Sequence, residues 1–134
     1  MIPIIDHINR YVSNTDTFVK FYQNALGYEL IGQDVKSNGN KFAVLKGFGH
    51  ELFISEKDDF AADDTSNFRH LGYSVKNIQD LLEQLKASGF VPKETQIIAK
   101  RFSKQFYIKD PDGFEIDLIE WTDKNEFYES LMQK

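Results

Sequence analysis

The stretch FYIKDPDGFEIDLIEW, residues 106–121, organises the rest of the chain. In it, two apolar-rich segments flank Asp110-Pro111-Asp112-Gly113. This pattern predicts a β-hairpin, because proline fixes φ for a turn and glycine accepts a positive φ. Asp117 lies among isoleucine and leucine in the second arm. A carboxylate there is costly unless it is paired, hydrogen-bonded or bound to a metal. We therefore expect Asp117 to have a partner.

The composition indicates one globular domain without nucleic-acid or membrane partners. The chain has 134 residues, 41% of them hydrophobic, which suffices for a packed core. Its formal net charge of −5 does not attract nucleic acid or an anionic membrane. No apolar run approaches the ~20 residues of a transmembrane helix, and the first residues lack the charged region of a signal peptide. We therefore expect a soluble cytoplasmic protein.

The absence of cysteine limits the chemistry that the chain can perform. It excludes disulfides, thiolate metal sites and cysteine nucleophiles, so any metal must take nitrogen and oxygen ligands.

The pattern of apolar and turn residues predicts two successive groups, each a strand, a helix and further strands. The expected strands are residues 2–12, 28–33, 41–45, 50–55, 69–75, 101–109 and the second hairpin arm, with 90–92 and 95–99 also extended. The expected helices run from an N-cap at Thr15 or Asp16 to Gly27, from Asn77 to Gly89, and over about 123–133.

The two groups form an internal repeat. The segment from His7 to Asn14 can be set over the segment from His70 to Asn77, with histidine first and asparagine seven residues later. A strand with an acid follows in each half, Glu51 in the first and Asp117 in the second. We therefore predict an α+β fold of two βαβββ modules, residues 1–65 and 66–121, plus a C-terminal helix, in a single domain.

Two histidines and two carboxylates from different strands are a ligand set for a divalent metal. An isolated strand histidine is more often a hydrogen-bonded core or surface residue, but the equivalent places of His7 and His70 favour a shared role. We therefore predict that His7, Glu51, His70 and Asp117 bind a metal. His50 has no counterpart in the repeat and has the opposite strand parity to Glu51, so we expect it at the surface.

A local basic cluster contains Lys100, Arg101 and Lys104. It indicates either a solvated edge strand, where such charges discourage aggregation, or a site for an anionic substrate.

Taken together, these segments resemble the vicinal oxygen chelate superfamily, which includes glyoxalase I, fosfomycin-resistance enzymes, extradiol dioxygenases and bleomycin-binding proteins. The segments that carry the resemblance are Asp6–Ile8, Phe21-Tyr22, Leu26-Gly27, Glu51-Leu52, Arg69–Leu71, Ser88-Gly89 and Asp110–Leu118. The resemblance implies that the modules close a cup-shaped, partly open β-barrel around one divalent metal, often completed in a homodimer. It also places the family's metal ligands on His7, Glu51, His70 and Asp117.

For function, the resemblance implies a glyoxalase I-like lyase or isomerase that uses Zn, Ni or Mn, with Fe as a less favoured metal. Its substrate would be the hemithioacetal of a small 2-oxoaldehyde, and Asp117 or Glu51 would be the base. Members like glyoxalase I carry Glu in place of Asp117, Arg in place of Tyr11 and Asn in place of Ser55. These departures favour a thiol other than glutathione, or a different substrate, with Tyr11, Arg101 and Lys104 as candidate substrate-binding residues.

Two other functions remain open. A fosfomycin-type thiol or water transferase would use Arg101 and Lys104 to bind the phosphonate. A non-enzymatic protein of the bleomycin-binding kind would use an aromatic cup and no metal. A dioxygenase would hold Fe(II) with His7, His70 and Asp117, but the chain is short for that chemistry and offers no additional histidine placed as a base.

Overall fold

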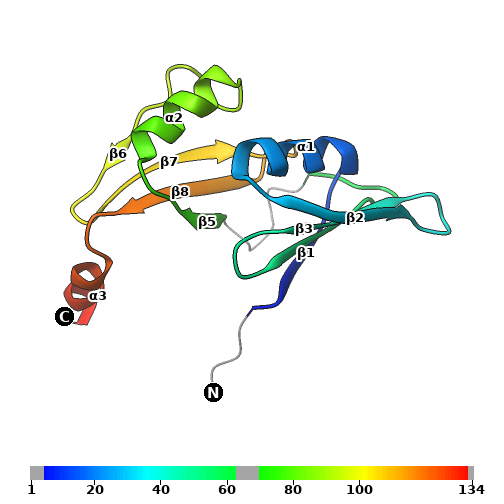
Figure 1. Ribbon diagram of the computed structural model, residues 1–134, viewed down its shortest axis with the longest axis horizontal. Coiled ribbons are helices and arrows are strands. Elements are labelled where there is room, and N and C mark those ends of the chain that lie inside the picture. The colour runs from blue at the N-terminus through cyan, green and yellow to red at the C-terminus, as the bar shows by residue number, and fades with distance from the viewer. Residues whose placement is uncertain (1–4, 63–69, 133–134) are drawn as a thin grey trace. The chain divides into compact units, whose positions relative to one another are not determined.

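The computed structural model describes residues 5–62 and 70–132. Over these ranges it contains three helices and two four-stranded sheets (Figure 1). The chain divides into two compact units. Unit 1 comprises Met1–Ser66 with Asp110–Gly113, and unit 2 comprises Asn67–Lys109 with Phe114–Lys134.

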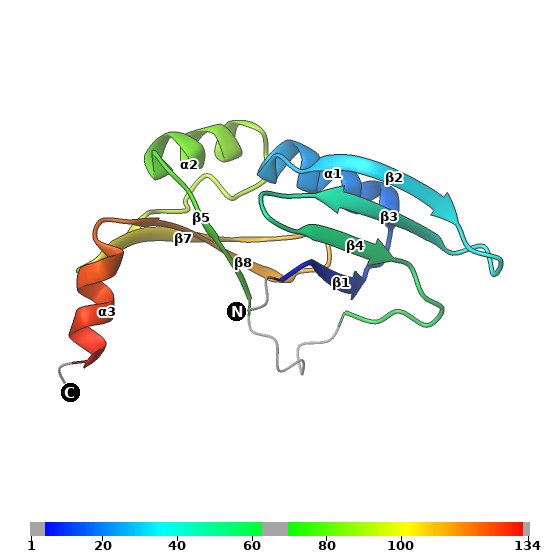
Figure 2. The same ribbon diagram turned by 60° about the horizontal axis from the view of Figure 1, so that its bottom comes forward.

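Unit 1 has the order strand, helix and three strands. Its elements are β1 (His7–Tyr11), α1 (Thr15–Leu26), β2 (Glu29–Val35), β3 (Lys41–Lys46) and β4 (Glu51–Ser55). The strands lie in the order β1-β4-β3-β2, as Figure 2 shows. Strand β1 runs parallel to β4, and the other two pairings are antiparallel.

Unit 2 repeats this arrangement. Its elements are β5 (Leu71–Ser74), α2 (Ile78–Ala87), β6 (Ile98–Ala99), β7 (Ser103–Lys109), β8 (Glu115–Trp121) and α3 (Lys124–Met132). The strand order is β5-β8-β7-β6, with β5 parallel to β8. The predicted α+β fold of two βαβββ modules is therefore confirmed. The extended segment expected over 95–99 is shorter than predicted, since only Ile98–Ala99 pairs with β7.

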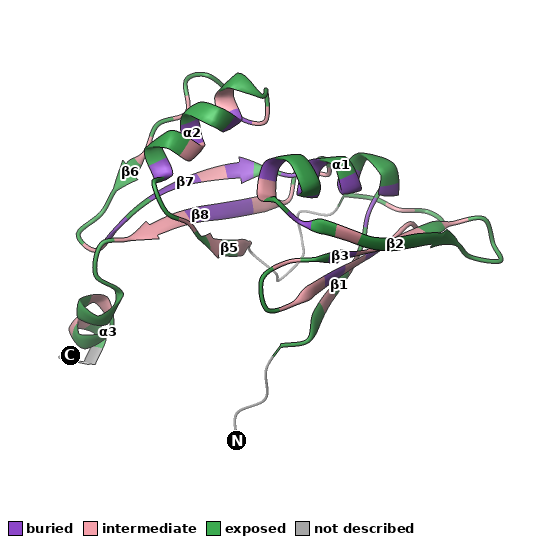
Figure 3. Ribbon diagram, in the orientation of Figure 1, coloured by how far each residue is buried: buried purple, intermediate pink, exposed green. Residues whose placement is uncertain are grey.

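Each sheet buries one face under the helix of its own unit, as the purple segments of Figure 3 show. In unit 1 the buried apolar residues include Phe18, Tyr22, Ala43, Leu45, Leu52 and Ile54. In unit 2 they include Ile78, Leu82, Leu85, Phe106, Ile116 and Leu118. Each large side chain of this kind contributes about 1.5–3 kcal/mol on burial. In β1 and β4 the residues of the other parity stay half-buried or exposed.

The ends of α1 differ in one respect from the prediction. The N-cap is Asn14, neither Thr15 nor Asp16, and its side chain accepts a hydrogen bond from Thr17 N at 2.9 Å. Asn14 is extended and can turn its side chain back onto the first turn, as N-cap residues do. Gly27 ends the helix as predicted, with φ of 72°.

None of the three helices in the described ranges combines the length and the apolar character that crossing a membrane requires.

Candidate metal and active site

In unit 1, the structure places His7 and Glu51 opposite each other. They are register partners on the parallel strands β1 and β4. Adjacent strands lie about 4.8 Å apart and register partners project from the same face, so the two side chains are neighbours. The His7 ring stacks on Phe53, with centroids 4.4 Å apart, and its Nδ1 lies 2.9 Å from Asp6 Oδ2. No hydrogen bond to the Glu51 carboxylate occurs within the described ranges.

In unit 2, His70 lies between two carboxylates. Its Nε2 is 3.9 Å from Asp117 Oδ2, and its Nδ1 is 3.3 Å from Glu115 Oε1. Nδ1 is buried, and the Glu115 contact does not have hydrogen-bond geometry, so this nitrogen has no hydrogen-bond partner in the described part of the chain. The imidazole therefore presents one nitrogen to each acid.

Asp117 has the partner that its apolar surroundings predicted. The side-chain amide of Gln105 donates from Nε2 to both carboxylate oxygens, at 3.0 and 3.1 Å. The same nitrogen lies 3.1 Å from the hydroxyl of Tyr107, the register partner of Asp117 on β7. A neutral amide satisfies hydrogen bonds without neutralising the charge, so the buried carboxylate can still be stabilised by a cation.

The register of unit 2 changes how the repeat aligns. Leu71 is opposite Ile116 on the parallel pair β5 and β8, so His70 extends toward Glu115. By this register Glu51 corresponds to Glu115, and Asp117 lies two residues further along the same face.

A second feature of the two units gives the same alignment. Glu56 and Glu120 lie five residues after Glu51 and Glu115, and each accepts hydrogen bonds from the N-terminus of its unit's helix. Glu56 Oε2 accepts from Thr15 N at 2.9 Å, and Glu120 accepts from the backbone N–H groups of Asn77 and Ile78 at 3.0 and 3.3 Å. The hydrogen bond from Thr15 lowers the pKa of Glu56.

The predicted substrate-binding residues each lie in a different local setting. Tyr11 is exposed on the His7 face of β1, where Lys57 Nζ lies 4.8 Å from the centre of its ring. Arg101 is exposed and stacks over Phe102, at 4.7 Å. Lys104 is the register partner of Glu120 and has the opposite parity to Gln105. The structure therefore does not bring Lys104 to the sheet face that carries Asp117.

His50 is half-buried, whereas the sequence predicted a surface position. Its Nε2 lies 2.8 Å from the hydroxyl of Tyr28. A Cβ on Gly47 would approach both rings to 2.8 Å, so the close packing here requires glycine.

A cavity of about 280 Å³ lies on the sheet of unit 1. Its lining includes Asn9, Lys36, Phe42, Phe53 and Ser55. Asn9 and Phe53 each follow the His7–Glu51 pair by two residues and share its face. A small apolar group with a polar or anionic end matches this lining.

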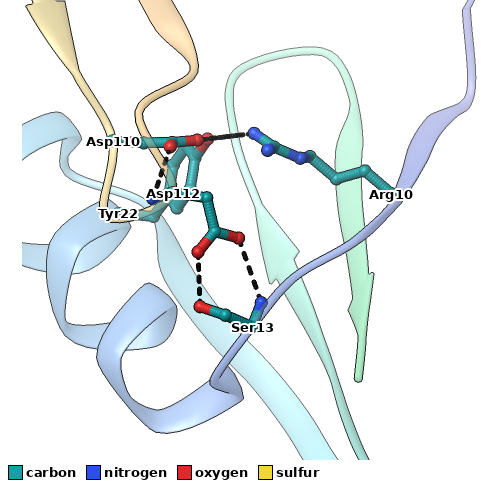
Figure 4. A network of polar contacts seen from close by, with 5 residues as sticks. All are labelled: Arg10, Ser13, Tyr22, Asp110 and Asp112. Atoms are coloured by element: carbon teal, nitrogen blue, oxygen red, sulfur yellow. Dashed lines mark hydrogen bonds and ion pairs between the residues drawn. The ribbon is translucent and has the colours of Figure 1, made fainter. Parts of the chain in front are cut away.

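The Asp110–Gly113 turn contacts the end of β1 and α1, as Figure 4 shows. Arg10 Nη1 donates to Asp110 Oδ2 at 2.6 Å, and the Tyr22 hydroxyl donates to the same oxygen at 3.4 Å. Asp112 accepts from the backbone N–H and the hydroxyl of Ser13. Burial raises the pKa of Tyr22, which keeps its hydroxyl protonated as a donor. Sequence reasoning explained this turn by proline and glycine alone and missed the role of its acids.

The residues fit a divalent metal in their chemistry. Two imidazoles and two carboxylates are an N and O donor set for such an ion, and His70 and the buried Asp117 face each other. Over the described ranges, no group of three or more histidine and acid side chains is placed to hold a metal.

Comparison with known proteins places these features in a family. The family model described as the Glyoxalase/Bleomycin resistance protein/Dioxygenase superfamily matches residues 4–118. A lactoylglutathione lyase of Neisseria meningitidis is 26% identical over 121 residues, covering 85% of this chain and 88% of the relative. The metallothiol transferase FosB of Lysinibacillus sphaericus is 26% identical, covering 95% of this chain and 90% of the relative.

Solved structures agree with these relatives. The crystal structure of a glyoxalase family protein from Enterococcus faecalis matches with a TM-score of 0.73 and 26% identity. The match covers 87% of this chain and 96% of that protein.

Proposed function

Because the chain belongs to the Glyoxalase/Bleomycin resistance protein/Dioxygenase superfamily, we propose that it is a divalent-metal-dependent lyase or isomerase of the glyoxalase I type. Its substrate is the hemithioacetal of a small 2-oxoaldehyde. The observation that carries the proposal is that each unit holds a histidine beside a carboxylate on its sheet. The similarity to a lactoylglutathione lyase supports this reaction.

The proposed ligands are His7 and Glu51 from unit 1 with His70 and Asp117 from unit 2, contributed by one chain or by two chains of a homodimer. Zn, Ni or Mn suits two imidazoles and two carboxylates. When bound, such a metal polarises the neighbouring oxygens of a substrate and stabilises the negative charge that develops on them.

Glu51 is the better of the two candidate bases. Asp117 is buried and its two oxygens are both held by Gln105. Glu51 is half-buried, has the longer side chain and makes no such contact within the described ranges. A general base must reach the proton that it removes. We therefore assign proton removal to Glu51 and orientation of the site to Asp117, which Gln105 holds in place.

The proposed step is an isomerisation in which no atoms are gained or lost. Glu51 removes the proton from the carbon that bears sulfur and hydroxyl, and returns it to the neighbouring carbonyl carbon. The hydroxyl proton passes to the other oxygen, so the product is the thioester of a 2-hydroxy acid. The cavity beside Phe42 and Phe53 binds the substrate during this transfer, with Tyr11 on the same sheet face.

Metal analysis tests the ligand set first. Protein purified without chelator and loaded with Zn, Ni or Mn is expected to bind one equivalent, measured by elemental analysis and calorimetry. His70→Ala and Asp117→Ala should each lose this binding. His50→Gln is the matched control, because it removes the third histidine of the chain, which contacts Tyr28. Absence of stoichiometric metal under every loading condition would refute the proposal.

An activity panel tests the reaction. Methylglyoxal is mixed with glutathione or with another small thiol, and thioester formation is followed by absorbance. Turnover is expected with a thiol other than glutathione, since Tyr11 and Ser55 replace the residues that the glutathione enzymes of this family carry.

The fosfomycin-type transferase is the alternative, and the similarity to FosB over 95% of the chain supports it. It requires cations beside the metal, whereas Lys104 lies on the other face of the sheet from Asp117. Addition of a thiol to fosfomycin without turnover of any hemithioacetal would favour it. A chain that binds no metal but retains a small aromatic ligand would favour the bleomycin-binding type.

A further inference from the structure

We propose that Glu115 and Asp6 are positioning residues, which direct the Nε2 atoms of His70 and His7 toward the metal. The proposal rests on the proposed function, because it assigns those histidines as ligands. It begins from one shared feature. In both units a carboxylate oxygen lies at Nδ1 of the histidine, at 2.9 Å from Asp6 and 3.3 Å from Glu115.

This placement decides which nitrogen can bind a cation. A neutral imidazole carries one N–H, and the hydrogen bond made by one nitrogen determines which of the two is bare. A carboxylate at Nδ1 accepts a hydrogen bond from an N–H there and leaves the Nε2 lone pair free for a metal. Partners of this kind fix the orientation of histidine ligands in many metal sites.

The geometry around His70 separates the roles of two nearby acids. Asp117 faces Nε2, at 3.9 Å, and Glu115 faces Nδ1 on the other side of the ring. Nδ1 is buried without a hydrogen bond, and Glu115 is the carboxylate beside it. Glu115 is 40% exposed, so a small rotation of its side chain can give the 3.3 Å contact hydrogen-bond geometry. Asp117 therefore acts as the ligand, and Glu115 acts through His70.

The two carboxylates reach their nitrogens by different routes. Asp6 is the residue before His7 in the chain, whereas Glu115 comes from β8. Glu115 also occupies the place that Glu51 holds in unit 1. The duplicated topology therefore does not explain the shared contact, since the two carboxylates come from different positions of the repeat.

The first experiment reads the tautomers directly, without metal or substrate. Nitrogen-15 NMR of the metal-free protein, at a pH where all three imidazoles are neutral, is expected to show the Nδ1–H form at His7 and His70. Glu115→Ala should convert His70 to a mixture of tautomers, and Glu115→Gln should restore part of the Nδ1–H form, because an amide oxygen still accepts. An unchanged His70 tautomer in Glu115→Ala would overturn the proposal.

The second experiment measures metal affinity. Glu115→Ala is expected to weaken binding about 10–100-fold, as loss of such partners does elsewhere. Asp6→Ala should have a smaller effect, because the Asp6 side chain is 84% exposed. Glu94→Ala, which removes an exposed acid from the segment between α2 and β6, is the control and should bind as wild type does.

Three outcomes are distinguishable. Wild-type affinity in both Asp6→Ala and Glu115→Ala would overturn the positioning role and leave the proposed function intact. Loss of metal in Glu115→Ala as complete as in Asp117→Ala would overturn it too, since Glu115 would then be a ligand. A wild-type protein that binds no metal would refute the proposed function, whereas the tautomer measurement would still report on the contacts.

Discussion

Units 1 and 2 share one topology but hold their histidine and carboxylate differently. His7 is 42% exposed, and the Glu51 carboxylate has no hydrogen bond within the described residues. His70 is 26% exposed, and Gln105 holds the buried Asp117 through both oxygens. The duplicated strands thus set the position of each histidine and its carboxylate. The neighbouring hydrogen-bond partners determine how firmly these side chains are held. Under the proposed function, this difference assigns metal anchoring to unit 2 and proton transfer to unit 1.

The largest expected effect is on turnover, and it tests this division of roles. Glu51→Gln should lower kcat about 10²–10⁴-fold, the usual contribution of a general base, while metal affinity falls less. Asp117→Asn should instead lower metal affinity first. Steady-state kinetics and calorimetry on the same preparations measure both. If Glu51→Gln loses the metal and Asp117→Asn loses only kcat, the roles of the two units are the reverse of those proposed.

The next effect is on folding and concerns a buried charge pair of unit 1. Arg10→Met removes the cation that lies 2.6 Å from the buried carboxylate of Asp110, and breaking such a pair costs about 3–5 kcal/mol. The urea midpoint should fall accordingly. The double variant Arg10→Met with Asp110→Asn is the control, because it also removes the negative charge of Asp110 and should recover part of the loss. Equal urea midpoints for the single and double variants would show that the charge of Asp110 does not cause the loss of stability.

The units also differ in the space around one glycine in each. Gly47→Ala would place a Cβ 2.8 Å from the rings of Tyr28 and His50, and overpacking of this kind costs about 1–3 kcal/mol. Gly72 is opposite Asp117, and a Cβ there meets no described atom within 4 Å. Gly72→Ala should therefore change stability by less than about 0.5 kcal/mol.

Gly72→Leu extends this comparison from stability to function. It should fill the space beside Asp117 and raise KM without lowering the melting temperature. If Gly72→Ala destabilises as much as Gly47→Ala, that space is already occupied.

The smallest effect concerns Glu56 and Glu120, whose carboxylates accept hydrogen bonds from backbone N–H groups at the helix N-termini. The Thr15 N–H holds the pKa of Glu56 below 4.5, so the folded state binds fewer protons than the unfolded state in acid. The stabilisation by Glu56 is therefore complete at neutral pH and is lost as pH falls through the lowered pKa. Glu56→Gln should cost about 1 kcal/mol at pH 7, and the difference from wild type should shrink below about pH 4.5.

The corresponding change in unit 2 tests whether the two caps are equivalent. Glu120→Gln should give a similar loss at pH 7, measured by urea unfolding, because Glu120 accepts from two N–H groups of α2. A loss in one unit only would show that the shared geometry does not mean shared energetics.

Much of the fold could be predicted because it depends on the spacing of residues that are close together in the sequence. The spacing of Phe18, Phe21 and Tyr22 follows the helical period, and Gly27 stops α1 at the predicted residue. Asn14 was missed as the N-cap because Thr15 and Asp16 are equally suited by residue type, and only the backbone of Asn14 turns its side chain onto Thr17.

The candidate site could be predicted only in part, since its contacts join distant positions. Asp117 stood out as a charge in an apolar strand, but its donor Gln105 is set by hairpin register. The register of residues 103–109 against 115–121 could have indicated Gln105 and Tyr107, which share a parity. The alignment of Glu51 with Glu115 could not be found from residue types, because Asp117 is the acid that an apolar context makes conspicuous. The contact between Arg10 and Asp110 likewise joins positions that are 100 residues apart in the sequence.

The position of the Asp110–Gly113 turn in unit 1 has a consequence for protein synthesis. On the ribosome, β1 to β4 emerge long before residue 110, so the hydrogen bonds of Arg10 and Ser13 to Asp110 and Asp112 can form only after the turn has been made. A nascent chain arrested before residue 110 should be cut by protease within its first 66 residues, whereas one arrested well beyond residue 113 should resist.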